Sequence, residues 1–315
     1  MPVNEPDELP IFTHWLQFLE RELIALQEAL ITGRYQPGAF FTFEVQDPKR
    51  RAICAAPFRD RVVHHAICGV LEPVFERRAI FDSYACRQGK GTHAAIARAQ
   101  QFARRTACFA KCDVRRFFAS VDHRVLQTLL RRLFKDAPLL ALLDRIIAHA
   151  PPDADPGRGL PIGNLTSQHF ANLYLGELDH HFKDRLGVRG YLRYMDDMLL
   201  FADDKATLHQ WLAELRTVLA QRLGLVLKEA VTLVAPVTAG IPFLGFRVYP
   251  GLIRLNPRTR RRFLHQVRVL EQAHADGILD TPDLCHRAAS LFAHVAQADS
   301  LGLRRRVAAA SIVDG

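Results

Sequence analysis

The sequence lacks any ordered spacing among its cysteines. Six cysteines stand among 315 residues, and no two of them form a C-x-x-C pair. This absence argues against a zinc ribbon and against a disulfide framework, whereas the reduced thiols of a cytoplasmic protein fit. The chain also lacks the basic-then-apolar start of a signal peptide and any apolar run of about 20 residues that could span a bilayer. We therefore expect a cytoplasmic protein without a membrane partner.

Acidic residues are too few to balance the basic ones. Lys and Arg number 42 against 33 Asp and Glu, which gives a formal net charge of +9. Such a surplus favours a polyanionic partner, although a solvated basic surface would give the same count. The hydrophobic fraction of 49% and the absence of low-complexity linkers argue against disorder and leave room for two or three subdomains.

Helical and strand-like patterns alternate along the chain. Apolar residues at three- or four-residue steps predict helices over about 15–33, 58–80, 165–185 and 205–222, and Thr92 is expected to cap a further helix. Shorter apolar runs predict strands over 40–57, 108–113, 191–201, near 225–234 and over 241–255. This alternation predicts an α+β fold with an antiparallel sheet.

Aspartates at two places in the chain predict a metal site. Asp113 ends an apolar run, and Asp196-Asp197 stand between the runs YLRY and MLLF of a predicted hairpin. Converging carboxylates can hold two Mg²⁺ ions about 3.5–4 Å apart, which activate a hydroxyl and stabilise a leaving pyrophosphate. A second pair, Asp203-Asp204, precedes a predicted helix, where turn or cap chemistry accounts for it. This second pair serves as an internal negative control.

From about Gln36 to Arg268 the chain resembles the reverse transcriptases. YMDD at 194–197 is similar to the acidic hairpin of that family, and KCDVRRFFASVDH at 111–123 to the strand with its first metal-binding aspartate. The resemblance implies an RNA-directed DNA polymerase of right-hand architecture. Its N-terminal helix and fingers would span 1–107, its palm with interleaved fingers helices 108–250, and its thumb 251–315.

The resemblance also implies roles for single residues. Asp113 and Asp196 would bind both Mg²⁺ ions, or Mn²⁺ in their place, and Asp197 would be more peripheral. Phe118 falls where a bulky side chain excludes a 2′-hydroxyl, so deoxynucleoside triphosphates would be preferred. Plain core packing is the alternative for such a ring, and it fits its neighbour Phe117.

Basic residues supply the expected contacts to phosphates. Lys49 and Arg51 lie in a hairpin that closes over the triphosphate in similar enzymes, where cations stabilise the leaving charge. The residues expected to contact template and nascent DNA are Arg59, Arg61, Arg87, Lys90, Arg258, Arg261 and Arg262. For each of them a solvated surface charge is the alternative. FLGF at 243–246 matches the hairpin that steadies the primer end, although Phe243 could equally be core.

One segment departs from the common family pattern. Most relatives carry Gln-Gly-x-x-x-Ser-Pro below the templating base, whereas Ile162, Gly163 and Gln168 stand at the corresponding places here. This departure resembles the reverse transcriptases of diversity-generating retroelements, which misincorporate opposite template adenines. That subgroup implies a structured template RNA and a small basic accessory protein as partners. Because the sequence stops soon after the expected thumb, we expect no RNase H or endonuclease domain.

Other functions stay open at this point. The polymerase could belong to a defence-associated, retron-like or group II intron-derived system, which the neighbouring template RNA would distinguish. A basic RNA-binding protein with a vestigial site is a second option, although clustered carboxylates facing a polyanion serve no purpose in a binding module. A Mg²⁺-dependent nuclease is a third, weakened by the lack of a suggestive His-Asp or Glu cluster.

Overall fold

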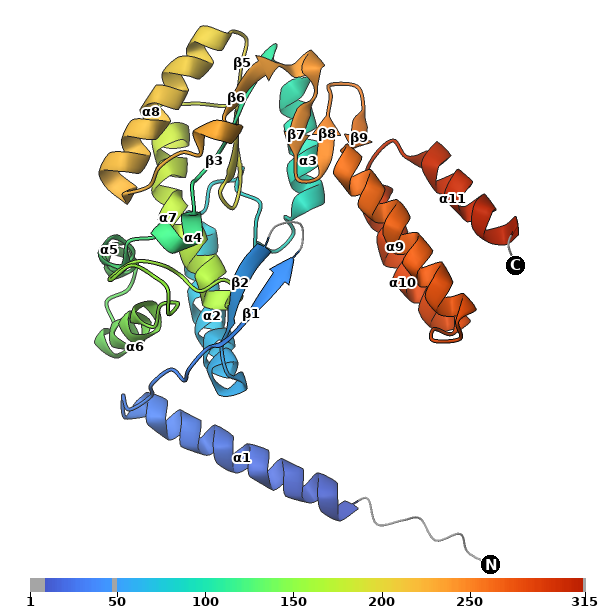
Figure 1. The fold of residues 1–315 in the computed structure, drawn as a ribbon. Helices are drawn as coiled ribbons and strands as arrows, with labels where there is room; N and C mark the ends of the chain where they lie inside the picture. The colour runs from blue at the N-terminus through green and yellow to red at the C-terminus, as the bar shows by residue number, and fades with distance from the viewer. Residues whose placement is uncertain (1–8, 47–49, 314–315) are drawn as a thin grey trace, which may run out of the picture. The chain divides into compact units, whose positions relative to one another are not determined.

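The computed structural model describes the backbone of residues 9–46 and 50–313, and the side chains of 19–46, 50 and 52–309. The chain forms two compact units. The first comprises Met1–Arg77 and Phe118–Tyr174, and the second comprises Arg78–Phe117 and Leu175–Gly315. Figure 1 shows the course of the chain through both units. Neither unit is continuous in sequence, so each is completed by segments far apart along the chain.

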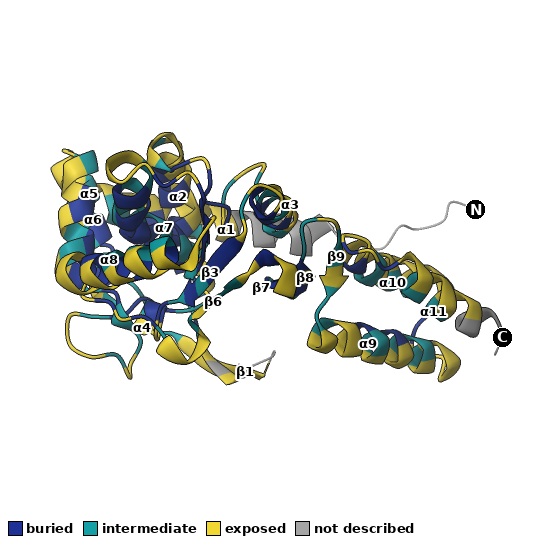
Figure 2. Cartoon of the chain, turned by 90° about the horizontal axis from the view of Figure 1, so that it is seen from above, coloured by how far each residue is buried: buried dark blue, intermediate teal, exposed yellow. Residues whose placement is uncertain are grey.

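The first unit is mainly helical. Its helices are α1 (Leu9–Ile31), α2 (Phe58–Arg78), α4 (Phe117–Ser120), α5 (His123–Leu133), α6 (Ala137–Ala148) and the first part of α7 (Leu165–His180). Asp122 and Asp136 cap α5 and α6 by accepting bonds from backbone N–H groups of the first turns. Strands β1 (Phe41–Gln46) and β2 (Arg50–Ala55) pair as an antiparallel hairpin, and β1 is exposed along its whole length (Figure 2).

The second unit is built on a four-stranded antiparallel sheet in the order β4-β5-β3-β6. The strands are β3 (Cys108–Asp113), β4 (Tyr191–Tyr194), β5 (Asp197–Ala202) and β6 (Leu233–Pro236). Helix α3 (Thr92–Ala103) packs on β4 and β5, and α8 (Lys205–Leu223) packs on β3, β5 and β6. Because β3 and β5 lie between other strands and below helices, their apolar side chains are almost wholly removed from water.

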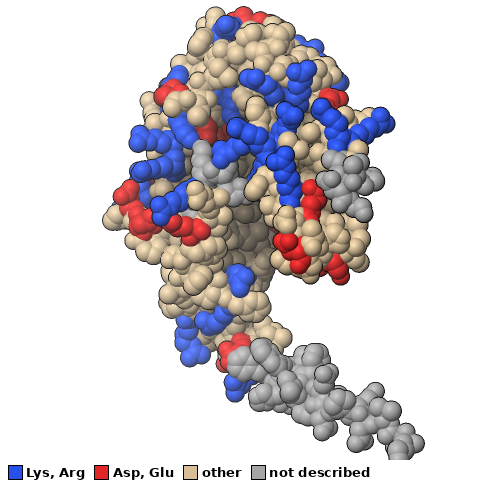
Figure 3. Space-filling view, turned by 45° about the vertical axis from the view of Figure 1, so that its right-hand side comes forward, with Lys and Arg blue, Asp and Glu red and all other residues tan. Residues whose placement is uncertain are grey.

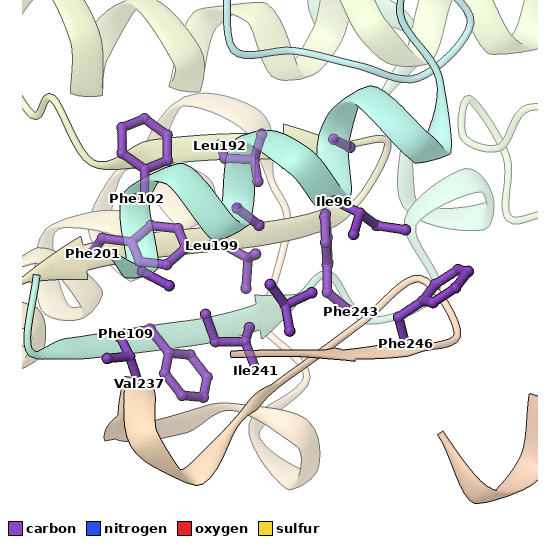
Figure 4. Packing of buried hydrophobic residues seen from close by; sticks show 14 of the residues in the cluster. Ile96, Phe102, Phe109, Leu192, Leu199, Phe201, Val237, Ile241, Phe243 and Phe246 are labelled. Carbon is purple, nitrogen blue, oxygen red and sulfur yellow. The ribbon is translucent and has the colours of Figure 1, made fainter. Parts of the chain in front are cut away.

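A second antiparallel sheet extends the core of this unit. It contains β7 (Ile241–Phe243), β8 (Phe246–Val248) and β9 (Ile253–Leu255) in chain order. Figure 4 shows how side chains from α3, from the four-stranded sheet and from this sheet meet in one apolar cluster. Phe243 is 1% exposed there, so its packing in the core is confirmed. The FLGF hairpin is therefore fixed to the sheet that carries the aspartates.

Three helices follow the small sheet. They are α9 (Pro257–Ala275), α10 (Thr281–Val295) and α11 (Leu301–Val313), which meet in a cluster around Phe263, Val267 and Val295. Asn256 caps α9, and Pro257 occupies its first turn, where a missing N–H costs no hydrogen bond. The arginines of α9 are exposed.

The α+β fold predicted from the sequence is confirmed, with two local corrections. The strand expected near 225–234 is shorter and lies later in the chain, at Leu233–Pro236. The residues before it contact the end of β3 only through an isolated bridge between Leu227 and Val114. Thr92 does not cap α3; Gly91 is the cap residue, and the Thr92 hydroxyl donates to the Tyr194 hydroxyl over 3.2 Å. Within the described residues, no helix is long and apolar enough to cross a membrane.

Candidate active site

The second unit brings the three predicted aspartates together at one end of its sheet. Asp113 is the last residue of β3 and stands opposite Asp197, the first residue of β5, in the antiparallel register. Asp196 lies in the tight turn before Asp197, and its side chain shares a hydrogen bond with that of Asp113. Residues some eighty positions apart in the sequence are therefore neighbours.

Burial and mutual repulsion dominate the electrostatics of this cluster. Burial raises the pKa of Asp196 to about 7, and the charge on Asp113 adds to the shift. Burial, followed by the charge on Asp197, also raises the pKa of Asp113, while Lys228 and Lys111 lower it. The nearby lysines therefore do not offset the burial and repulsion of the Asp113–Asp196 pair, and carboxylate oxygens are the ligands that Mg²⁺ prefers.

Asp197 has a different environment. One of its carboxylate oxygens lies 3.1 Å from the Lys111 ammonium, with both side chains partly buried. Among the residues that the structure describes, no three His, Cys, Asp or Glu side chains are already arranged around one point as metal ligands.

The control pair behaves as an ordinary helix start. Asp204 caps α8, where its side chain accepts from the Thr207 backbone N–H at 2.7 Å and from the Thr207 hydroxyl at 2.8 Å. These bonds lower the pKa of Asp204. Asp203, next to it, is exposed. Asp196 and Asp204 thus differ in burial and in the direction of their pKa shifts.

Sequence reasoning missed a cationic pocket beside Asp113. The charged residues that line this pocket are Arg115, Arg116, Lys228 and Glu229, and the Glu229 carboxylate is paired with Arg216. The Lys228 backbone N–H donates to the Asp113 carbonyl over 2.8 Å. Arg116 has a φ of 46°, a left-handed conformation that turns the chain directly after β3. The arginines of the DVRR string could have suggested this pocket, whereas nothing local marks Lys228.

The predicted nucleotide-contacting residues 162–168 lie in the first unit. The Ile162 carbonyl accepts from the Cys54 backbone N–H at 2.9 Å, which ties this segment to β2. Gly163 has a φ of 117°, and a Cβ there would come within 2.9 Å of Ile53, so only glycine fits. Gln168 is half-buried on α7. The Phe118 side chain is also half-buried, whereas Phe117 is only 2% exposed and belongs to the core.

The predicted phosphate-contacting residues have diverse surroundings. Lys49 and the side chain of Arg51 lie outside the described residues. The guanidinium of Arg59 lies over the Tyr35 ring, and that of Arg61 over the Phe58 ring. Their roles in nucleic-acid binding stay predictions.

Two further predicted contacts bond to their own segment. The Arg87 guanidinium donates to the carbonyls of Ile80 and Ser83, and the Lys90 ammonium donates to the carbonyl of Phe81. These bonds give both side chains a part in shaping the segment before α3. The predicted thumb residues Arg258, Arg261 and Arg262 are exposed on α9, where Arg261 Nε donates to the Pro257 carbonyl over 3.4 Å. Figure 3 shows one face of the molecule, on which Lys and Arg spread more widely than Asp and Glu.

Carboxylates clustered at a strand end of a basic α+β chain are typical of nucleic-acid polymerases, and comparison with known families identifies the particular family. Residues 46–248 match the family described as reverse transcriptase (RNA-dependent DNA polymerase). The match covers more than half of the chain. The chain therefore belongs to the reverse transcriptase family.

Individual relatives agree with this family. Protein YkfC of Escherichia coli K12 is 27% identical over 272 residues, covering 72% of this chain and 71% of the relative. Nuclear intron maturase 1, mitochondrial, of Arabidopsis thaliana is 33% identical over 87 residues, which cover 28% of this chain and 12% of the maturase. Both relatives are therefore similar to this chain at a moderate level of identity.

Solved telomerase structures share the fold. Telomerase from Candida albicans, in a complex with a fragment of telomeric RNA, superposes with a TM-score of 0.53 at 13% identity, covering 88% of this chain and 55% of that one. Apo telomerase from Candida tropicalis gives a TM-score of 0.54 at 11% identity, covering 70% of this chain and 49% of that one. The chain thus spans about half the length of the telomerases it matches, and the likeness concerns the fold alone.

Proposed function

We propose that this chain synthesises DNA on an RNA template and that Asp113, Asp196 and Asp197 form its catalytic site. One observation carries the proposal: the end of β3 and the β4–β5 turn place three carboxylates side by side in a chain of the reverse transcriptase family. When bound, two Mg²⁺ ions would activate the primer hydroxyl and stabilise the leaving pyrophosphate. Asp113 and Asp196 would hold both ions.

The cationic pocket gives the triphosphate a place beside these carboxylates. Arg115, Arg116 and Lys228 gather positive charge at the end of β3, next to Asp113. Cations in such a position bind phosphates in the ground state and stabilise the charge that develops on pyrophosphate. We assign the pocket to the β- and γ-phosphates, with Lys49 and Arg51 of the hairpin as further contacts. Lys111 would keep the Asp197 carboxylate oriented when no second ion is bound, since its ammonium lies 3.1 Å from one carboxylate oxygen.

Metal binding and stability should be linked through Asp196. A carboxyl group whose pKa is raised by folding destabilises the folded state once it ionises, so stability falls as the pH rises from about 4 to about 7. A bound divalent cation offsets this repulsion. We expect Mg²⁺ to raise the melting temperature more at about pH 8 than at about pH 5, by roughly 2–4 °C. Differential scanning fluorimetry at both pH values measures this difference.

Asp196→Asn provides the control for this linkage. The variant removes the repelling charge, so without Mg²⁺ it should melt above the wild-type chain near neutral pH and respond less to added Mg²⁺. An equal Mg²⁺ effect at both pH values in the wild-type chain would contradict the assignment of the ions to Asp113 and Asp196.

The remaining partners follow from the same proposal. The exposed arginines Arg258, Arg261 and Arg262 of α9 would lie along the phosphates of the template and nascent DNA, contributing sequence-independent and salt-sensitive affinity. Arg59 and Arg61 would contact the template. The division into fingers (1–107), palm (108–250) and thumb (251–315) is part of the proposal. A structured template RNA and a small basic accessory protein complete the proposed assembly.

We further propose error-prone copying, as in a diversity-generating retroelement. The segment Ile162–Gln168 supports this, because Ile162 offers neither donor nor acceptor where the common pattern has an amide. The bond from Cys54 fixes the backbone of Ile162, so a change of its side chain should leave the backbone in place. The effect of residue 162 on fidelity can therefore be tested by a single substitution.

Ile162→Gln should lower misincorporation opposite template adenine by about threefold to tenfold, because the amide restores a hydrogen-bonding group near the nascent pair. Single-nucleotide incorporation on primed RNA, with matched and mismatched nucleotides, measures this ratio. Val70→Gln, an exposed apolar-to-amide change on α2, is the matched control and should leave the ratio unchanged. Unchanged fidelity in Ile162→Gln would remove this residue from the explanation.

A second candidate role is supported by a specific relative. The match to an intron maturase favours a reverse transcriptase derived from a group II intron, which copies a structured intron RNA rather than a variable template. Both candidates share one chemistry and differ in the RNA that is copied. Sequencing of cDNA made by the purified chain on both kinds of RNA separates them.

Primer extension tests the shared chemistry. The purified chain, a primed RNA template, Mg²⁺ and deoxynucleoside triphosphates should yield extended primers, and chelation of the metal should stop the reaction. A basic RNA-binding protein with a vestigial site would bind the primed RNA and extend nothing. A Mg²⁺-dependent nuclease would shorten the strands. Either result would overturn the proposal.

A further inference from the structure

A buried guanidinium lies next to the acidic turn. Arg193, on β4, is 1% exposed, and it precedes Met195 by two residues. Arginine is almost never buried to this extent unless its charge is paired and its donors are used. The residues around Arg193 must therefore supply an opposite charge and acceptors for its N–H groups.

The side chain of Arg193 joins three segments of the second unit. Its Nε and Nη2 donate to the two carboxylate oxygens of Asp179 on α7, at 2.7 and 2.6 Å. Nη1 donates to the Met195 carbonyl at 3.0 Å, and Nη2 also donates to the Ser83 hydroxyl at 3.1 Å. The Tyr191 hydroxyl donates to Asp179 as well, at 2.6 Å. One planar group thus links a helix, the catalytic turn and the segment before α3.

The hydrogen bond from Arg193 to the Met195 carbonyl affects the position of the Asp196 carboxylate. Met195 has a φ of 53°, a left-handed conformation that residues other than glycine rarely adopt and that persists only where neighbours hold it. Met195 directly precedes Asp196, so its backbone conformation sets the direction of the Asp196 side chain. A donor on the Met195 carbonyl therefore helps to hold Asp196 beside Asp113.

The segment before α3 is itself held in place. The Asp82 carbonyl accepts from the Arg193 backbone N–H at 2.9 Å, and the Tyr84 N–H donates to the Arg193 carbonyl at 3.0 Å. The Asp82 carboxylate accepts from Arg98 at 2.7 Å and from Lys183 at 2.8 Å. This segment is a fixed edge beside β4, so the Ser83 hydroxyl offers Arg193 an acceptor at a defined position.

We propose that Arg193 is a positioning residue for metal binding: paired with Asp179, its guanidinium fixes the Met195 turn so that Asp196 meets Asp113. The inference rests on the proposed function, because it concerns the same carboxylates. Lysine cannot replace arginine in this role. Its single ammonium can neutralise Asp179 but cannot reproduce a planar fork that reaches Asp179, Ser83 and Met195 together.

Direct metal binding by Arg193→Lys tests this inference. Mn²⁺ binding, followed by electron paramagnetic resonance without nucleotide or primer, should weaken about tenfold in Arg193→Lys, a fold-change typical when support behind metal ligands is lost. The Mg²⁺ concentration for half-maximal primer extension should rise by a similar factor. Arg216→Lys is the matched control, since Arg216 pairs with Glu229 through two bonds of 2.7 and 2.9 Å but has no bond to the turn. It should bind Mn²⁺ like the wild-type chain.

Two further variants separate the outcomes. If Arg193→Lys does not fold, Arg193→Met combined with Asp179→Leu replaces the ion pair by apolar side chains of similar volume and should show the same weakened binding. Wild-type Mn²⁺ affinity in a folded Arg193 variant, together with lost binding in Asp196→Asn, overturns the positioning role and leaves the metal site intact. Wild-type affinity in Asp196→Asn overturns the metal site itself.

Discussion

Asp196→Asn should lower primer extension on an RNA template by about a thousandfold or more, because it removes a charged metal ligand from the centre of the site. The substitution keeps the size of the side chain and its capacity to hydrogen-bond with Asp113. Its effect therefore reports the lost charge rather than a lost contact. Single-turnover extension with saturating primer-template and deoxynucleotides measures the loss, and thermal melting shows that the variant is folded.

Asp203→Asn is the control for this prediction. Asp203 is exposed, whereas its neighbour Asp204 caps α8, so replacing Asp204 would remove the helix cap, lower stability and confuse the comparison. Asp203→Asn should extend primers like the wild-type chain. Equal inactivity of a folded Asp203→Asn protein would mean that the acidic pair of the active site has been chosen wrongly.

The contrast between the two acidic pairs shows what local sequence can predict. The apolar runs around 191–201 predict two strands with a turn between them, and the structure forms that hairpin with Asp196 in the turn and Asp197 starting β5. The residues after Asp203 predict a helix, and Asp204 caps one. In both cases residues within five or six positions decide the local structure. The spacing of apolar residues, every second position in a strand or every 3.6 in a helix, is therefore sufficient to predict the element.

Contacts between distant segments could not be predicted in this way. Arg193 and Asp179 stand 14 positions apart in the sequence, and a surface position is the default expectation for a charged residue. Only the packing of α7 against β4 makes them partners. The same holds for Lys228, which reaches Asp113 because the segment after α8 returns to the end of β3.

Phe118→Ala should relax discrimination against ribonucleotides by about a hundredfold, the second largest effect that we expect. Phe118 follows Asp113 by five residues, and the ring would exclude a 2′-hydroxyl by its volume. An apolar pocket rejects a substrate with one added hydroxyl by only about a hundredfold. Removing the Phe118 ring can therefore lower the discrimination against ribonucleotides by about that factor. Incorporation of a deoxynucleotide and of the matching ribonucleotide, compared as kcat/KM, measures the change.

The neighbouring ring provides the control that separates this role from core packing. Phe117 is 2% exposed, whereas the Phe118 side chain is half-buried, so the two adjacent phenylalanines differ in their accessibility to a ligand. Phe117→Leu should lower the melting temperature and leave sugar selectivity unchanged, because it alters only the core. If Phe118→Ala lowered stability in the same way and kept wild-type selectivity, both rings would be core residues. Sugar selection would then depend on a different side chain.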